Sequence, residues 1–243
     1  MKAVILAAGI SARLRPLTDN TPKCLLKVGA KSILERTIDN LIANEINDVI
    51  VVTGYLKEMI EDFLQKKYPK LNFTFIYNDK YDSTNNIYSL WMTKDRVLGN
   101  DILLLDSDII FDSRIIGQLL NSNHENCLSV RSDHELGVEE IKILINVDKS
   151  IREISKLINP LSAVGESIGI EKFNSNFVEH LFKVLDKKII EQKKVNIFYE
   201  AAFQDAINEG AKIFPIDVEN YKCVEIDTAE DFEIAATLVE GIS

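Results

Sequence analysis

The chain has 243 residues, of which 46% are hydrophobic, and its formal net charge is −10. An acidic surface repels polyphosphate, which argues against nucleic acid as the main partner. The hydrophobic share predicts a packed core and argues against disorder. Three widely spaced cysteines and the lack of an apolar run of membrane-spanning length are typical of a cytoplasmic protein with reduced thiols. The sequence leaves a homodimer open.

Strand-like and helical patterns alternate in the first half of the chain. Continuous Val/Ile/Leu runs suit strands that are covered on both faces. Amphipathic patterns predict helices over 32–46, where Ser32 and Glu35 form a capping box, and over 57–67. This alternation predicts an α/β fold with a doubly wound, mostly parallel, Rossmann-like sheet, whose site lies at the carboxyl ends of the strands. The predicted strands are 4–7, 48–54, 73–77 and 101–106.

The pattern changes after residue 124, where strands follow one another without long helices. We expect these strands to form a smaller antiparallel sheet at the open end of the first. Thr228, with an acid three residues later, is expected to cap the last helix. The chain is interpreted as one domain, 1–243, with parts 1–123 and 124–243. The later predicted elements are strands 127–131, 141–147, 151–157 and 163–171, and helices 174–192 and 198–209.

The strongest motif directly follows the first predicted strand. Small residues ending in Gly9 let backbone N–H groups approach a phosphate, and Arg13 and Lys23 add positive charge along the same loop. The string is not a dinucleotide fingerprint, which needs G-x-G-x-x-G, and it is not a Walker A loop, because it has no Gly-Lys-Ser/Thr. Gly9 alone would be compatible with an ordinary strand and loop, but the whole string is not.

Residues 6–18, LAAGISARLRPLT, followed by Pro22 and Lys23, resemble the signature of the sugar-phosphate nucleotidyltransferase family. The resemblance implies that Arg13 holds the leaving phosphates of an NTP and that Lys23 contacts the transferred α-phosphate and the acceptor phosphate. It also implies a nucleotide-binding part, 1–123, and an acceptor-binding part, 124–243. Ser11 stands where glycine is usual, and can adopt the required backbone only at some cost; Ala12 stands where Thr or Ser is usual. The implied phosphate-binding residues are Leu6, Ala7, Ala8, Gly9 and Ser11.

Two acidic motifs extend this resemblance. Asp106 and Asp108 follow the fourth predicted strand, and Asp227 lies near the last helix. The family pairs the equivalents of Asp108 and Asp227 around one metal, and oxygen ligands suit Mg²⁺; Asp106 is assigned to the nucleotide. An acceptor phosphate is already an anion, so no general base is needed. The histidines, His124, His134 and His180, are interpreted as surface residues.

The segment 77–90 resembles a branch of small cytidylyltransferases that act on phosphocholine, aminoethylphosphonate or inositol phosphate. The resemblance assigns Gly54, Tyr55, Ser83, Thr84 and Asn85 to the base and ribose of the nucleotide. Glu166 and Glu200 could meet a cationic head group, and Tyr88, Trp91 and Tyr199 either offer it aromatic faces or belong to the core. The residues assigned to the acceptor are Asn86, Tyr88, Glu166, Ser167, Tyr199 and Glu200.

The expected activity is Mg²⁺-dependent transfer of CMP from CTP to a small phosphorylated acceptor, such as phosphocholine or 2-aminoethylphosphonate, with release of pyrophosphate. One alternative is a hexose-1-phosphate nucleotidylyltransferase that uses UTP, dTTP or GTP. Another is a catalytically inactive relative that senses nucleotides, although the presence of Arg13, Lys23, Asp108 and Asp227 argues against it. The sequence leaves the base, the acceptor and the oligomeric state open.

Overall fold

Four parallel strands form the centre of the molecule in a computed structural model, which describes residues 1–239. Strand β1 lies between β4 and β6, and β5 lies beyond β4. Their Val, Ile and Leu side chains are almost all buried, as continuous apolar runs require when both faces are covered. The bounds are β1 Lys2–Ala7, β4 Asp48–Thr53, β5 Asn72–Tyr77 and β6 Ile102–Asp106.

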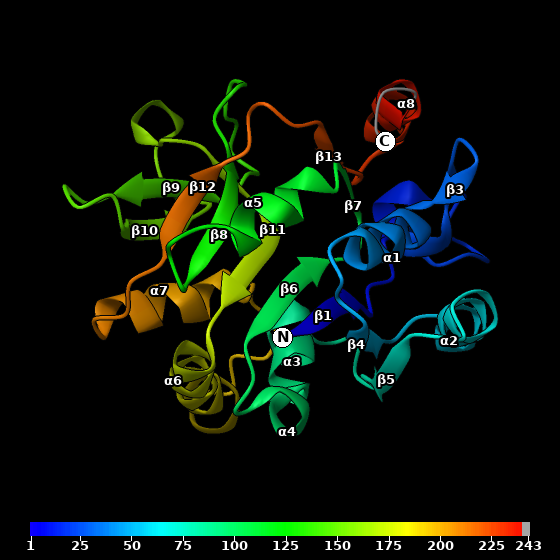
Figure 1. Cartoon of the computed structure of the whole chain (residues 1–243), viewed down its shortest axis with the longest axis horizontal. Coiled ribbons are helices and arrows are strands. Elements are labelled where there is room, and N and C mark those ends of the chain that lie inside the picture. Colours follow the sequence, from blue (N-terminus) through cyan, green and yellow to red (C-terminus); the bar gives the residue numbers. More distant parts are fainter. Residues whose placement is uncertain (240–243) are drawn as a thin grey trace.

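Helices cover both faces of this sheet (Figure 1), which confirms the predicted doubly wound α/β fold. One face packs against α1 (Ile33–Ala43), α2 (Lys57–Lys67) and α5 (Arg114–Leu120). The predicted cap of α1 is present, since the Ser32 side chain accepts the Glu35 N–H at 3.2 Å. The opposite face packs against α3 (Asn86–Met92), α4 (Lys94–Val97), α6 (Ser175–Asp186) and α7 (Glu200–Asn208).

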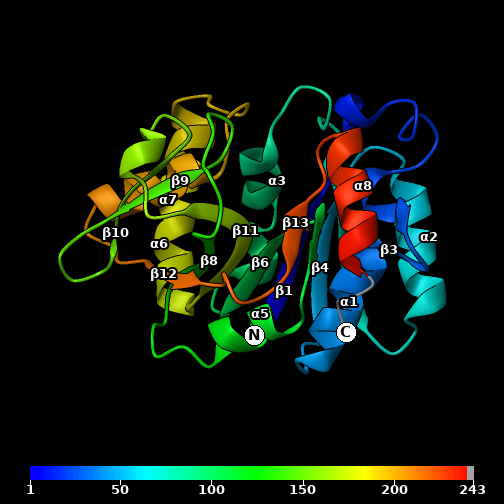
Figure 2. The ribbon, with the colours of Figure 1, turned by 90° about the horizontal axis from the view of Figure 1, so that it is seen from above.

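The antiparallel strands of the second half continue the same sheet. Strand β11 pairs antiparallel with β6, and further strands follow it to give the order β10-β9-β11-β6-β1-β4-β5, with β8 and β12 branching from β11. Figure 2 shows the two parts of the molecule on either side of β1 and β6. The bounds are β8 Cys127–Arg131, β9 Lys142–Ile145, β10 Ile151–Ser155, β11 Glu166–Phe173 and β12 Phe214–Asp217.

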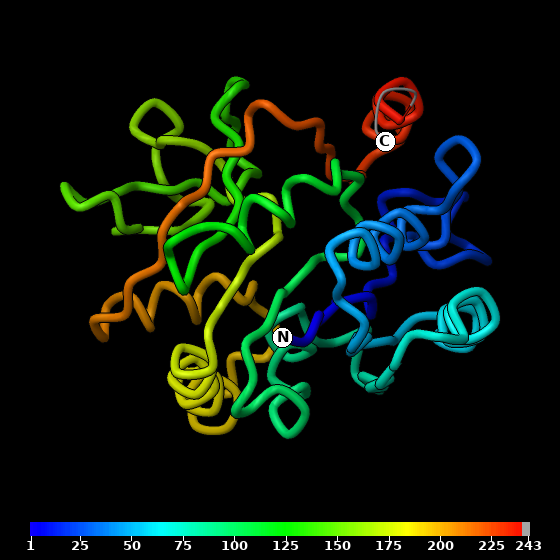
Figure 3. The backbone as a smooth tube through the Cα atoms, in the orientation of Figure 1, coloured from blue at the N-terminus to red at the C-terminus, as the bar shows by residue number. Residues whose placement is uncertain are grey.

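The C-terminal segment crosses from the second part back to the first, as the chain trace shows (Figure 3). Its first strand, β12, pairs with β8, and its second strand, β13 (Cys223–Glu225), pairs with β7 (Ile109–Phe111). The segment continues into α8 (Ala229–Leu238). Buried Ala235 of α8 packs in one cluster with Leu14 and Val28 from the N-terminal region. The first loop of the chain is therefore held against its last helix. The remaining elements are η1 Ala12–Leu14, η2 Lys23–Leu25, β2 Lys27–Val28, β3 Lys31–Ser32, η3 Pro160–Ser162 and the π-turn η4 Lys187–Glu191.

Within residues 1–239, no helix has both the length and the apolar character needed to cross a membrane.

Candidate active site

A cavity of about 950 Å³ lies at the carboxyl ends of β1 and β6, between the two parts of the molecule. This is the edge where ligands bind in open α/β sheets. The structure brings most of the predicted site residues to its wall. These are Leu6, Ala7, Ala8, Gly9, Ser11, Arg13, Lys23, Thr84, Asn85, Asn86, Asp106, Asp108, Glu166, Ser167, Glu200 and Asp227.

The loop after β1 has the left-handed backbone that the sequence predicts at its usual glycine position. Ser11 has φ 52° and ψ 51°, a region that costs a non-glycine residue roughly 1–2 kcal/mol. The hydroxyl of Thr18 donates to the Ser11 carbonyl oxygen at 3.0 Å, which holds the turn in place. The loop therefore presents its backbone to the cavity although Ser11 stands at the position where glycine is usual.

Three residues assigned to the nucleotide, Gly54, Tyr55 and Ser83, do not line the cavity. Gly54 packs directly on the first loop, where an added Cβ would collide with the Ala8 carbonyl oxygen. The Tyr55 hydroxyl donates to the carbonyl oxygens of Thr18 at 3.1 Å and Asp19 at 2.7 Å. Gly54 and Tyr55 thus support the loop after β1 from behind, and their contact with the base stays a prediction.

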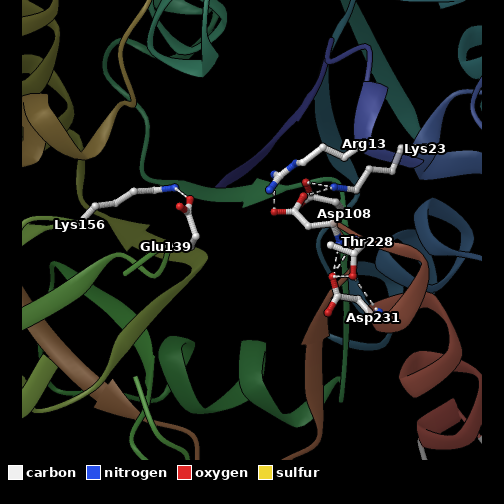
Figure 4. A network of polar contacts seen from close by, with 8 residues as sticks. Arg13, Lys23, Asp108, Glu139, Lys156, Thr228 and Asp231 are labelled. Carbon is white, nitrogen blue, oxygen red and sulfur yellow. Dashed lines mark hydrogen bonds and ion pairs between the residues drawn. The ribbon is translucent and has the colours of Figure 1, made fainter. Parts of the chain in front are cut away.

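The four residues predicted to be catalytic meet in one cluster of charges, in which Figure 4 labels Arg13, Lys23 and Asp108. The Lys23 ammonium lies 2.9 Å from Asp108 Oδ2 and 2.7 Å from Asp227 Oδ1. The Arg13 guanidinium lies 2.7 Å from Asp227 Oδ2. Pairing of β7 with β13 places the two acids side by side, because the Ile226 N–H donates to the Asp108 carbonyl oxygen at 3.0 Å.

Mutual attraction favours the charged forms of Lys23 and Asp227. Burial by itself would lower the pKa of Lys23, but Asp108 and Asp227 together raise it above its usual value. Burial works against ionisation of Asp227 too, yet Lys23 and Arg13 hold its pKa below the usual range. The neighbouring Glu225, which sequence reasoning did not assign, has carboxylate oxygens within 4.8 Å of those of Asp108 and Asp227. Desolvation and repulsion from these two acids raise its pKa.

The start of α8 fixes the backbone at Asp227. Asp231 Oδ2 accepts the N–H of Asp227 at 3.0 Å and the N–H of Thr228 at 2.7 Å. The Thr228 side chain in turn accepts the Asp231 N–H at 3.2 Å, which completes the predicted capping box. This helix terminus therefore orients the residue that pairs with both cations.

The aromatic residues considered either for the acceptor or for the core lie in the core and not on the cavity wall. Tyr199 is fully buried, and its hydroxyl bonds Asp106 Oδ2 at 2.9 Å and Glu171 Oε1 at 3.3 Å. Tyr88 and Trp91 do not line the cavity and pack against the core.

Burial, followed by repulsion from neighbouring acids, raises the pKa of both Asp106 and Glu171 well above the usual range. Glu171 belongs to no motif, so the sequence did not indicate it.

The far end of the cavity contains side chains that sequence reasoning missed. His134, interpreted as a surface residue, lines the cavity with its Nε2 atom 3.1 Å from Glu166 Oε1. Lys156 pairs with Glu139 at 3.4 Å, on the opposite side of the view in Figure 4 from the cluster of Lys23. The acid-rich segment after β8 was a sequence signal for His134 and Glu139.

Glu200 begins α7 and lines the cavity. The residue is 7% exposed, and its Oε2 atom has no hydrogen-bond partner within the described part of the chain. Burial raises the pKa of Glu200 to about 7, against an opposing effect of its own backbone N–H and Lys156. With a pKa near neutral pH, the protonation of this carboxyl group responds to a charged ligand that binds beside it.

Replacement of Glu200 by Gln should flatten the pH dependence of stability. The folded-state pKa of about 7 lies above the unfolded value of 4.5, so Glu200 favours folding at low pH and its contribution is lost as pH rises through 7. The loss is on the order of 3 kcal/mol. Urea unfolding between about pH 5 and pH 8 measures it. Parallel curves for the wild-type protein and Glu200→Gln would contradict this interpretation.

Comparisons with known proteins agree with this architecture. The nucleotidyl transferase family model matches residues 2–129. The choline-phosphate cytidylyltransferase of Streptococcus pneumoniae is 30% identical over 240 residues, which cover 96% of this chain and 95% of that protein. The CTP:phosphoglutamine cytidylyltransferase of Campylobacter jejuni is 28% identical over 253 residues, covering 96% and 98%. A solved structure of CTP:phosphocholine cytidylyltransferase from Streptococcus pneumoniae has a TM-score of 0.81 and 28% identity, with 98% of each chain covered. The chain therefore belongs to the nucleotidyl transferase family.

Proposed function

We propose that this protein transfers CMP from CTP to a small phosphorylated acceptor and releases pyrophosphate. The observation that carries the proposal is the meeting of Arg13, Lys23, Asp108 and Asp227 on one cavity wall, beside the loop after β1. The similarity to two cytidylyltransferases over nearly the whole chain supports CTP as the donor.

Charge neutralisation and placement supply the catalysis. Lys23 and Arg13 are held in position by carboxylates, and phosphate oxygens of the donor would take over part of this pairing when CTP binds. The two cations then offset the negative charge that builds on the α-phosphate and on the leaving pyrophosphate. The acceptor phosphate is an anion at neutral pH, so attack needs alignment and no proton removal.

The chemistry of the donor set fits a hard cation such as Mg²⁺. Asp108, Asp227 and Glu225 offer carboxylate oxygens within 4.8 Å of one another, and such ligands are those that Mg²⁺ prefers. Asp108 Oδ1 is buried and has no hydrogen-bond partner in residues 1–239, so it has a lone pair to offer. We assign Asp108 and Asp227 as the residues that would hold the metal, which would neutralise phosphate charge.

The far end of the cavity, where His134 and Glu166 lie, supports an acceptor with a positively charged group. Glu140, Glu166 and Glu200 line this end, and a hexose phosphate carries no charge that could pair with them. The acceptor phosphate would face Lys23, and the rest of the acceptor would extend toward these acids. The proposal therefore favours phosphocholine or 2-aminoethylphosphonate over a hexose 1-phosphate.

Removal of divalent metal should abolish turnover. EDTA is expected to stop pyrophosphate release from CTP and added Mg²⁺ to restore it. Asp108→Asn and Asp227→Asn should each lower kcat by on the order of 10²-fold, because each removes a charged oxygen from the cation site. Asp62→Asn, at an exposed acid of α2 paired with Lys66, is the control and should keep full activity. Undiminished turnover after chelation would contradict a role for metal.

Asp231 should act as a positioning residue for Asp227. Asp231→Ala removes an N-cap interaction and should lower the free energy of unfolding by about 1 kcal/mol. It should also lower kcat by roughly tenfold, because the carboxylate of Asp227 loses its fixed direction. Asp231→Asn keeps an acceptor oxygen and should restore part of kcat.

The control for Asp231 is Glu230→Ala, in the same first turn of α8. It should leave kcat unchanged. If Asp231→Ala lost stability but kept the wild-type kcat at saturating substrate, Asp231 would have only a structural role.

A further inference from the structure

We propose that the acceptor end of the cavity recognises a primary ammonium group, whose N–H groups donate to buried carboxylate oxygens, rather than a quaternary trimethylammonium group. The inference rests on the proposed CMP transfer and narrows the class of acceptor. Three observations support it. They concern the polar atoms of this wall that lack a hydrogen-bond partner, the partners of the nearby basic side chains, and the cations that lie beside the aromatic rings.

The first observation concerns buried oxygens without a partner. Across residues 1–239, Glu200 Oε2, Glu140 Oε2 and Ser167 Oγ are buried side-chain atoms that make no hydrogen bond, and all three residues line the cavity. Glu200 is the most enclosed of them, with 7% of its surface exposed. Buried polar groups in native proteins are almost always paired, so these atoms indicate a site that a ligand completes.

The missing partners are hydrogen-bond donors. An ionised carboxylate can only accept, and a serine hydroxyl can do so as well. A primary ammonium carries three N–H donors, whereas a trimethylammonium group carries none. A quaternary ligand would cover the oxygens of Glu140 and Glu200 with methyl groups and leave them buried and unpaired.

The second observation is that three neighbouring basic side chains already have acidic partners. The Lys156 ammonium pairs with Glu139 at 3.4 Å, and Arg131 donates to Asp133 at 3.0 Å. His134 lies against Glu166, at 3.1 Å. No ion pair in the described chain reaches the carboxylates of Glu140 or Glu200, and Lys156 offsets the charge of Glu200 only in part, so the wall keeps a negative charge. A donor with a positive charge therefore suits it better than a neutral amide or hydroxyl.

The third observation is that the aromatic rings near this end of the described cavity wall each already have a cation beside one face. Quaternary ammonium groups are recognised by open aromatic faces. Of the aromatic rings on the described cavity wall, Phe198 has the Lys156 ammonium 4.6 Å from its centroid, and Tyr221 has the Arg114 guanidinium at 4.8 Å. Tyr81 packs beside Gly54, at the nucleotide end. The acceptor end thus offers oxygens without donors rather than an aromatic cage.

A methylation series tests this inference at constant charge. Pyrophosphate release from CTP is measured with phosphoethanolamine and with its N-methyl, N,N-dimethyl and N,N,N-trimethyl forms, the last being phosphocholine. We expect kcat/KM to fall with each methyl group, to about a hundredfold below phosphoethanolamine for phosphocholine, because donors are lost while buried acceptors remain. Equal or better use of phosphocholine would overturn this inference alone. Lack of transfer to every member would overturn the proposed function, and this inference with it.

A variant locates the effect at the acceptor wall. Glu200→Gln should reduce the preference for phosphoethanolamine over phosphocholine by about tenfold, since a charged acceptor is lost. Glu209→Gln is the matched control at the other end of α7, where the acid pairs with His180 outside the cavity, and it should keep the wild-type preference. An unchanged preference in Glu200→Gln would remove Glu200 from the acceptor site. If that variant fails to fold, Glu140→Gln provides the same comparison.

Discussion

One ammonium group connects three distant parts of the chain. Lys23 contacts Asp108 at the end of the central sheet and Asp227 before the last helix, at distances below 3 Å. Only 9% of the Lys23 side chain is exposed, and a buried charge is tolerated only when it is paired. The fold therefore has to bring both acids to this point. The same charge becomes useful when a phosphate anion replaces one of the carboxylates.

Much of the surrounding structure serves to hold these charges in place. The pairing of β7 with β13 puts Asp108 beside the segment that carries Asp227, and the capping box of α8 fixes the backbone of Asp227. In the loop after β1, Ser11 has a strained, left-handed backbone conformation, and this loop lines the cavity. Strain and close charges of this kind are typical of functional sites, where they are stabilised by the rest of the fold.

The sequence predicted the fold and the reacting charges because both depend on local patterns. Strand and helix periodicities are local, and the motif around Gly9 and Lys23 is continuous along the chain. The acceptor wall depends instead on where single side chains point. Tyr199 and Glu200 are neighbours in sequence, yet at the start of α7 one faces the core and the other the cavity. Glu171 and His134 belong to no motif, and only tertiary structure brings them to Tyr199 and Glu166.

The central claim is that Lys23 acts on charge that develops during phosphoryl transfer. The most direct measurement is steady-state pyrophosphate release from CTP and phosphoethanolamine by Lys23→Ala, compared with the wild-type protein. Our account predicts that kcat falls by on the order of 10²-fold or more while the KM for the acceptor changes little, because the charge is needed most in the transition state. A wild-type kcat, with only the KM for the acceptor raised, would contradict it.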